Sequence, residues 1–333
     1  MTPPGAIDIH AHAMPLSVLQ WLESEGLADL SDAERQIVRI DPRISGVGAN
    51  APLPLAISMT DPVTRLAEMD ATGVAAEAIS IPPFLVGSMC DDTDLVHEVV
   101  TRGNDALLEY CATAPERLLP LGTVPVGTRF AVDEARRSLD DLGMRGLTIG
   151  SRGCRLDLDD AVNDDLWSLL ADRRTFVFLH PSATPEPNRL KDFWFPQLVG
   201  YPMETAIAVT RLAFSGVLER APLVLCLAHG GGCLGSLRGR LDMGWERKPV
   251  ARTTVAPPRD LFDGLFYDTA VFDPVLLRRL VEDVGSGRVL LGTDHPFDLA
   301  ERDPLGFVGS AGLDPAAEAA ILRDNAIRLL GLE

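Results

Sequence analysis

Short apolar runs alternate with longer amphipathic stretches along most of the chain. The runs are four to seven residues long and rich in β-branched and aliphatic side chains, which is typical of buried strands in a parallel sheet. We expect strands at Ile7–His10, Ala76–Ile81, Leu118–Thr123, Gly146–Ile149, Phe176–His180, Leu223–His229, Leu265–Thr269 and Val289–Thr293.

The stretches between these runs have the apolar spacing of surface helices, and several begin with Asp, Thr or Pro, as helix starts prefer. Helices are expected at Pro62–Ala71, Thr93–Ala114, Val132–Leu142, Ala161–Ala171, Met203–Glu219, Pro274–Val284 and Pro315–Leu330. A doubly wound open sheet would carry a glycine-rich phosphate turn after an early strand, and the sequence contains no GxGxxG or Walker motif. The pattern therefore predicts an α/β fold of the (β/α)8 barrel type.

Two stretches break the regular rhythm, Leu16–Met59 and Pro181–Pro202, and each follows a strand that ends in histidine. Loops after barrel strands build the active site, and loops this long are usually functional. We therefore expect a single barrel domain over residues 1–333 that is distorted by insertions at about 16–59 and 181–202, the first forming a small lid.

The charge balance is acidic, with 48 Asp and Glu residues against 30 Lys and Arg. Such a surface repels nucleic acid and anionic lipid. No apolar run approaches the roughly 18 residues that span a bilayer, and no signal segment begins the sequence, so we expect a cytoplasmic protein. The five cysteines are scattered without a CxxC pair, which indicates buried free thiols.

Four of the six histidines lie at the end of an apolar strand, namely His10, His12, His180 and His229. The strand ends of a barrel converge on one rim, so residues far apart in sequence can meet there. His10 and His12 are two residues apart on a strand and therefore point to the same face. This clustering predicts a metal site.

Asp294 is the acid at the tip of the last expected strand. A cap or turn role is the alternative for it, just as hydrogen-bonded turn histidines are the alternative for the His10–His12 pair. Considered together, His10, His12, His180 and Asp294 form the ligand set that one Zn²⁺, Mn²⁺ or Fe²⁺ ion prefers, with a position left open for water or substrate.

Two roles fit His229, which is followed by three glycines that leave its ring unobstructed. It can act as a fifth metal ligand or as a general acid and base. We favour proton transfer, because four protein ligands leave little coordination room and imidazole titrates near neutral pH.

These residues lie in motifs that resemble the amidohydrolase superfamily, in particular the branch of 2-amino-3-carboxymuconate-6-semialdehyde decarboxylase. The similar segments are DIHAHAMP, the HP turn at His180, LVGYPMETAIAV, LAHGGGCLGSLRGRLD, FYDTAVFDP and VLLGTDHPF. The resemblance implies a distorted barrel, one divalent metal that is most often zinc, and non-oxidative decarboxylation without an organic cofactor. It implies that His10, His12, His180 and Asp294 are the metal ligands and that His229 is the general acid and base.

The resemblance also implies a homodimer in which Arg240 reaches the substrate carboxylate bound by the neighbouring subunit, and a substrate pocket shaped by Phe193 or Trp194. The family's second substrate arginine is replaced here by apolar residues within 52–59, so Arg39 or Arg43 is a candidate substitute.

Two further positions depart from the pattern: Ser182 stands where the decarboxylase has tryptophan, and His295–Pro296 stands where it has Tyr–Pro. The substrate is therefore expected to differ.

The leading hypothesis is a metal-dependent decarboxylase of a small unsaturated or aromatic carboxylic acid, with His229 and Asp294 as catalytic residues. The same site would serve a hydrolase or hydratase of a lactone, amide or unsaturated acid, and a non-enzymatic metal-dependent binding protein is the third class. A two-metal site bridged by a carbamylated lysine is not expected, because the fourth strand contains no lysine.

Overall fold

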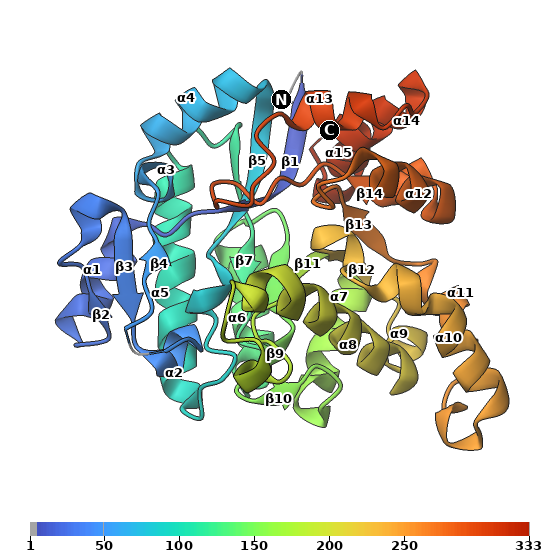
Figure 1. Ribbon diagram of the computed structural model, residues 1–333. Coiled ribbons are helices and arrows are strands. Elements are labelled where there is room, and N and C mark those ends of the chain that lie inside the picture. The colour runs from blue at the N-terminus through green and yellow to red at the C-terminus, as the bar shows by residue number, and fades with distance from the viewer. Residues whose placement is uncertain (1–4, 49, 333) are drawn as a thin grey trace.

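Parallel strands form the centre of the computed structural model, which describes residues 5–48 and 50–332 (Figure 1). One parallel sheet has the order β1-β5-β6, and a second has the order β14-β13-β12-β11-β8-β7. Their bounds are β1 Ala6–His12, β5 Val74–Ser80, β6 Leu118–Pro120, β7 Gly122–Thr123, β8 Leu147–Gly150, β11 Phe176–His180, β12 Val224–Leu227, β13 Phe266–Asp268 and β14 Val289–Leu290.

The two sheets join at both edges. On one side β6 and β7 are consecutive halves of one strand, and the intervening Leu121 donates its backbone N–H to Ile79 at 2.8 Å. On the other side the chain beyond β14 bonds to β1, because Ile9 N donates to Leu291 O at 2.9 Å and His12 N donates to His295 O at 2.8 Å. The described strands therefore close into a distorted (β/α)8 barrel, as the sequence predicts.

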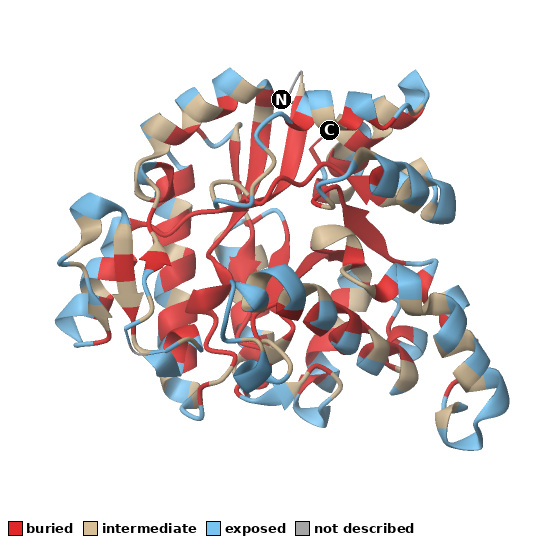
Figure 2. Cartoon of the chain, viewed as in Figure 1, coloured by how far each residue is buried: buried red, intermediate tan, exposed pale blue. Residues whose placement is uncertain are grey.

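Helices surround the barrel and turn their outer sides to solvent, whereas the strands are buried (Figure 2). The helices are α4 Pro62–Thr72, α5 Thr93–Cys111, α6 Ala131–Arg136, α7 Asp164–Arg173, α8 Tyr201–Phe214, α9 Val217–Arg220, α10 Leu234–Arg247, α11 Pro258–Phe262, α12 Pro274–Val284, α13 Pro304–Ser310, α14 Pro315–Ala319 and α15 Asn325–Leu330. The side chains of Asp61, Asp92, Asp273 and Asp314 accept hydrogen bonds from backbone N–H groups at the starts of α4, α5, α12 and α14. These caps fix the helix starts.

The first insertion is a folded unit beside the barrel. It contains α1 (Leu16–Ser24), α2 (Pro42–Ser45), α3 (Ile57–Thr60) and an antiparallel sheet of β2 (Ala28–Asp29), β3 (Ile37–Ile40) and β4 (Leu53–Pro54). Its buried Val38 and Ile40 belong to the same apolar cluster as Leu107 of α5 and Ile79 of β5. The unit therefore packs against α5 on one flank of the barrel (Figure 1).

Several predicted boundaries are wrong. The helix expected over Met203–Glu219 ends at Phe214, because Gly216 adopts a left-handed turn with φ 79° before α9 begins. The strand expected to reach His229 ends at Leu227. Helix α10 was not expected, since glycines at 235, 239 and 244 obscure its periodicity.

All five cysteines are free and four are buried, as the sequence predicts. Within the described part of the chain, no helix has both the length and the apolar character needed to cross a bilayer.

Candidate metal centre

The structure brings together the four residues that the sequence singles out as metal ligands. His10, His12, His180 and Asp294 are buried, and one nitrogen or oxygen atom of each lies within 4.8 Å of the others. Nε2 of His10 lies 3.1 Å from Oδ1 of Asp294, and Nε2 of His12 lies 3.3 Å from the same oxygen. The group sits where β1, β11 and the segment after β14 end on one rim of the barrel.

The other ring nitrogen of each of these histidines is held by the protein. Nδ1 of His10 lies 2.6 Å from Oδ2 of Asp268, Nδ1 of His12 lies 3.2 Å from Oγ of Ser80, and Nδ1 of His180 lies 2.8 Å from the Pro181 carbonyl. Such outer partners fix the tautomer and orientation of metal-binding imidazoles. Each ring therefore presents Nε2 to a common point.

These inward atoms fit a cation. Nε2 of the three histidines and Oδ1 of Asp294 are buried and have no aligned hydrogen-bond partner among the described residues. This is costly for polar atoms unless something else satisfies them. Ligands bound at about 2.0–2.1 Å in a tetrahedron are about 3.3 Å apart, close to the two separations from Asp294. Three imidazoles and one carboxylate suit one divalent transition metal.

Asp268 is a member of the site that sequence reasoning missed. Its Oδ1 accepts the N–H of Gly230 at 2.8 Å, while its Oδ2 is bonded to His10. One carboxylate therefore orients a ligand of the cluster and also the turn that carries His229. Its position at the end of β13 was the available signal, because the same criterion singled out Asp294 at the tip of the strand expected over Val289–Thr293.

Without a cation between them, these groups perturb one another strongly. Burial lowers the pKa of His10, but the carboxylates of Asp294 and Asp268 outweigh burial and raise it to about 10. Burial lowers the pKa of His12 to about 4, and burial with the neighbouring imidazoles holds that of His180 well below its usual value. Burial raises the pKa of Asp294, yet His10 and the other imidazoles keep it well below the ordinary range. His12, His180 and Asp294 thus have the proton-free form that metal binding requires.

His229 lies on the other side of Asp294. Its Nε2 is 3.6 Å from Oδ2 of Asp294, whereas His10 and His12 face Oδ1. The residue has a left-handed φ of 56° at the start of a tight turn in which Gly230, Gly231 and Gly232 also have positive φ. A Cβ on Gly232 would lie 2.1 Å from the Pro202 carbonyl oxygen, so this turn packs directly against the start of α8.

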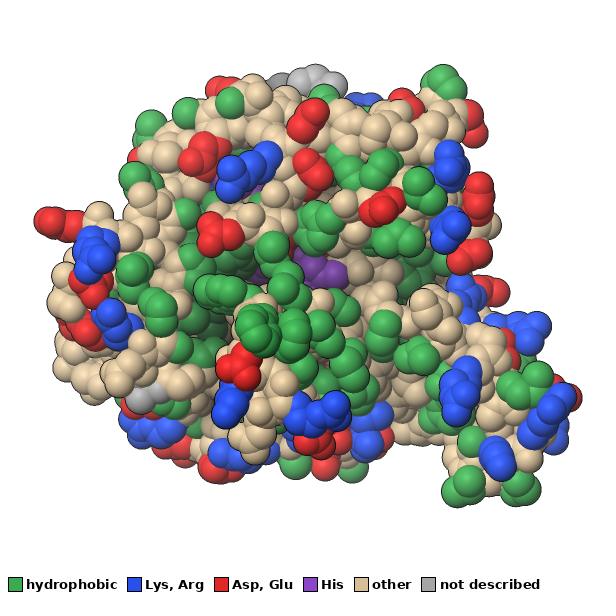
Figure 3. All heavy atoms as spheres, viewed as in Figure 1, with side chains coloured by type: hydrophobic (Ala, Val, Ile, Leu, Met, Phe, Trp, Pro, Cys, Tyr) green, Lys and Arg blue, Asp and Glu red, His purple; other side chains and the backbone are tan. Residues whose placement is uncertain are grey.

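The space beside the cluster is mainly apolar. Ile81, Pro83 and Val86, together with Thr148 and Ser182, line a cleft of about 10 Å³ that reaches His180. Histidine atoms are visible at the centre of this face and are surrounded largely by hydrophobic side chains (Figure 3).

Among the described residues, the other predicted residues form no hydrogen bond, ion pair or ring contact with the cluster. Phe193 and Trp194 are 79% and 63% exposed, in the second insertion, with positive φ. Arg39 and Arg43 pair with acids of the first insertion, Arg39 with Asp32 at 2.8 Å and Arg43 with its neighbour Asp41 at 2.9 Å.

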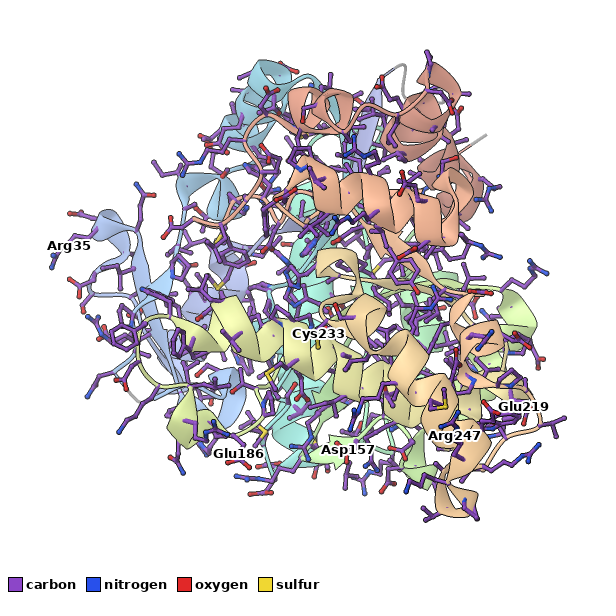
Figure 4. The ribbon with its side chains drawn as sticks, turned by 45° about the vertical axis from the view of Figure 1, so that its right-hand side comes forward. Arg35, Asp157, Glu186, Glu219, Cys233 and Arg247 are labelled. Carbon is purple, nitrogen blue, oxygen red and sulfur yellow. The ribbon has the colours of Figure 1, made fainter. Side chains whose placement is uncertain are left out.

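Arg240 is exposed on α10. Among residues 5–48 and 50–332 it has no ion-pair partner. Helix α10 leads outward, from Cys233 near the centre of the molecule to Arg247 at its periphery (Figure 4).

A closed βα barrel with one buried three-histidine, one-aspartate cluster at the strand ends defines a mononuclear metal site of an enzyme. The family model of the amidohydrolases matches residues 7–332, so the chain belongs to the amidohydrolase family.

Known proteins similar to this chain include several decarboxylases. The 2-amino-3-carboxymuconate-6-semialdehyde decarboxylase of Dictyostelium discoideum is 31% identical over 278 residues, which cover 82% of this chain and 77% of that protein. The gamma-resorcylate decarboxylase of Rhizobium sp. is 28% identical over 81% of this chain and 87% of that protein. The crystal structure of a dihydroxybenzoic acid decarboxylase from Polaromonas sp., which contains bound manganese, aligns with a TM-score of 0.77 at 24% identity and covers 100% of this chain and 98% of that chain.

Proposed function

We propose that this protein is a metal-dependent, non-oxidative decarboxylase that acts on a small aromatic or unsaturated carboxylic acid. The observation that carries the proposal is the convergence of His10, His12, His180 and Asp294 on one point, with His229 beyond the second oxygen of Asp294. The membership of the amidohydrolase family and the decarboxylase relatives support it. We treat residues 1–333 as a single barrel domain whose insertions at about 16–59 and 181–202 shape access to the site.

The chain's own residues divide the chemistry between them. A bound divalent metal would act as a Lewis acid that stabilises negative charge as CO2 leaves. When the bond to the carboxyl carbon breaks, its electron pair remains on the substrate carbon, and a proton must take the place of CO2 there. We propose that His229 supplies this proton and that Asp294, whose Oδ2 faces the His229 ring, transfers it to the substrate carbon.

We infer the identity of the metal from the atoms that would bind it. Three imidazoles and one carboxylate suit Zn²⁺, which we propose as the resident ion, and they also accept Mn²⁺ or Fe²⁺. The manganese in the Polaromonas relative makes Mn²⁺ the main rival. Elemental analysis of protein purified without added metal distinguishes them.

The walls of the site suggest the substrate. A ring or a double-bond system would pack against Ile81, Pro83 and Val86 beside His180, and the site must open to admit it, because the cleft there has a volume of only about 10 Å³. We propose Phe193 and Trp194 as residues that close over the bound acid, a role that requires the second insertion to move from its exposed position.

The remaining substrate contact would come from a second subunit. We propose a homodimer in which Arg240 of one copy reaches the substrate carboxylate in the other. Arg240 is exposed, and no described residue forms an ion pair with it. The same region exposes Met203 and Ile207 of α8 and Met243 of α10. A cytoplasmic location stays a prediction of the sequence.

Product analysis tests the proposed reaction. Metal-loaded protein is incubated with a panel of hydroxybenzoic and unsaturated acids whose carboxyl carbon is isotopically labelled, and the label is followed by mass spectrometry. The proposal requires labelled CO2 and a product that has lost the carboxyl group. A product that has gained water, from a panel extended to lactones and amides, would identify a hydrolase or hydratase instead.

A further inference from the structure

A buried arginine lies directly behind the metal cluster. Arg65 of α4 has a fully buried side chain that forms an ion pair with Glu77 of β5 at 2.6 Å. Burial would raise the pKa of Glu77, but the Arg65 guanidinium outweighs it and lowers that pKa to about 2. The pair is therefore charged, although both groups are removed from water.

The guanidinium donates to several segments at once. Nη2 donates to the backbone carbonyl of His12, and Nη1 lies 3.2 Å from Nδ1 of His295. Nε lies 3.1 Å from the Ser58 carbonyl and 2.9 Å from the Tyr110 hydroxyl, which itself donates to Ser58 O at 2.6 Å. The planar fork of arginine matches this arrangement of acceptors, whereas a lysine ammonium is a single point charge.

Two of these contacts belong to the metal site. His12 is a member of the cluster, and His295 directly follows Asp294, the member that faces both His10 and His12. His295 is fixed in turn by Glu77 at 3.1 Å and by Glu68 at 3.0 Å. The end of β1 and the segment after β14 are thus fastened to one rigid group.

We propose that Arg65 is a positioning residue of the metal centre, whose guanidinium holds His12 and the Asp294–His295 segment at the separation that a bound cation requires. A buried ion pair is weak support for stability, because well-packed apolar side chains often serve as well. Its value here lies in the fixed geometry of the acceptors. The hydrogen bond to the Ser58 carbonyl also ties the end of the first insertion, where the chain returns to the barrel, to the Arg65 guanidinium.

Arg117 provides a matched control at the opposite end of β5. Its Nε donates to Ala75 O at 2.9 Å, its Nη2 donates to Val74 O at 3.2 Å, and it pairs with Asp70 at 2.8 Å. Arg117 therefore also binds strand carbonyls and an acid, but it contacts no member of the cluster. R65M removes five polar contacts of a fully buried side chain and R117M removes three of a partly exposed one, so R117M controls for the loss of strand-carbonyl and carboxylate contacts near β5.

The test measures metal binding separately from folding. R65M, R65K and R117M are compared with the unmodified chain by the melting temperature of metal-stripped protein, by calorimetric titration with Zn²⁺, and by the d–d absorption of bound Co²⁺. We expect R65M and R65K to weaken Zn²⁺ binding by roughly ten- to a hundred-fold and to change the Co²⁺ spectrum. R65K should recover part of the melting temperature, because its ammonium still neutralises Glu77, without recovering metal binding. R117M should lower the melting temperature only.

The opposite pattern overturns the proposal. If folded R65K binds Zn²⁺ with unchanged affinity and an unchanged Co²⁺ spectrum, the fork does not position the ligands. If neither Arg65 variant is recovered folded while R117M is, the residue serves the fold and not the site. Because each readout requires only metal and protein, the result is independent of the reaction proposed above.

Discussion

The imidazoles of the cluster each use their two nitrogens for different purposes. Nδ1 of each cluster histidine bonds to an outer partner, which is Asp268 for His10, Ser80 for His12 and the Pro181 carbonyl for His180. Nε2 of each ring therefore faces inward. His229 differs, because its buried Nδ1 has no hydrogen-bond partner in the part of the chain that the structure describes and its Nε2 faces Oδ2 of Asp294. This difference separates the residue that we assign to proton transfer from those that we assign to the metal.

Replacement of His229 tests this assignment. H229A should retain one bound metal per chain while turnover falls by about two to four orders of magnitude, the usual contribution of a general acid or base. H97A is the control, because His97 stacks on Phe130 at 4.1 Å and belongs to no described part of the site. Metal content by emission spectrometry and turnover of the same preparations provide the comparison. Loss of metal from H229A would mean that His229 is a ligand.

Protonation of His10 predicts how metal binding depends on pH. Its pKa without a cation is raised to about 10, so at neutral pH the incoming metal must displace a proton. His12, with a pKa lowered to about 4, and His180 and Asp294, with pKa values well below their ordinary ranges, are already deprotonated. Metal affinity should therefore rise about tenfold per pH unit up to about pH 10.

Calorimetry in buffers of different ionisation enthalpy measures the proton count directly. About one proton should be released per metal bound at neutral pH. A value near zero would show that His10 is neutral before metal binds, with its single proton on Nδ1 facing Asp268 and none on Nε2.

At the scale of elements, the turn after β12 places His229 and depends on its glycines. Gly232 has φ 61° and its Cβ position lies 2.1 Å from Pro202 O, whereas Gly235 in α10 has open space around it. G232A must displace the turn or the start of α8. We expect it to lower stability by about 1–3 kcal/mol and turnover by about a hundredfold, since small misplacements of catalytic groups are costly.

G235A is the matched control, three residues along the same chain. Gly235 is the second residue of α10, where alanine should raise stability by less than about 1 kcal/mol and leave turnover unchanged. Thermal unfolding and steady-state kinetics of both variants decide the matter. Wild-type turnover in G232A would show that the turn tolerates displacement and does not position His229.

The sequence predicts the boundaries of some helices and strands correctly and those of others incorrectly. Phe176–His180 and Pro274–Val284 have the predicted boundaries, because a compact apolar run and a Pro start after a capping Asp are local signals. The strands predicted at the positions of β12 and β14 end later than the observed ones. The residues beyond the observed ends form irregular hydrogen bonds to distant segments, which no local sequence pattern reveals. Helix α10 was missed because its glycines and polar residues hide the period.

The same division holds for the site. The convergence of His10, His12, His180 and Asp294 followed from strand ends that must meet in a barrel. Asp268 carried the same signal but was not recognised.

Arg65 had no signal of its own, because an arginine on an amphipathic helix usually faces solvent. Its burial depends on Glu77 and on carbonyls that only the folded chain brings together.

At the scale of the whole molecule, the proposed dimer predicts complementation between inactive variants. R240A lacks the substrate arginine that each copy would give to its partner, and H229A lacks the proton-transfer group of its own site. A mixed dimer would contain one complete site, so exchanged mixtures should recover about a quarter of wild-type turnover. Sedimentation analysis confirms exchange. A dimer without recovery would place Arg240 outside the partner's site, and a monomer would refute the assembly.

The central claim is that one cation, held by His10, His12, His180 and Asp294, is required for loss of CO2. The most direct measurement titrates metal-stripped protein with Zn²⁺ or Mn²⁺ while CO2 release from an accepted aromatic acid is recorded, with D294N as a parallel sample. The account predicts no CO2 release from stripped protein, a linear rise that ends at one metal per chain, and no rise for D294N. Full activity without metal, or an end point at two metals per chain, would contradict it.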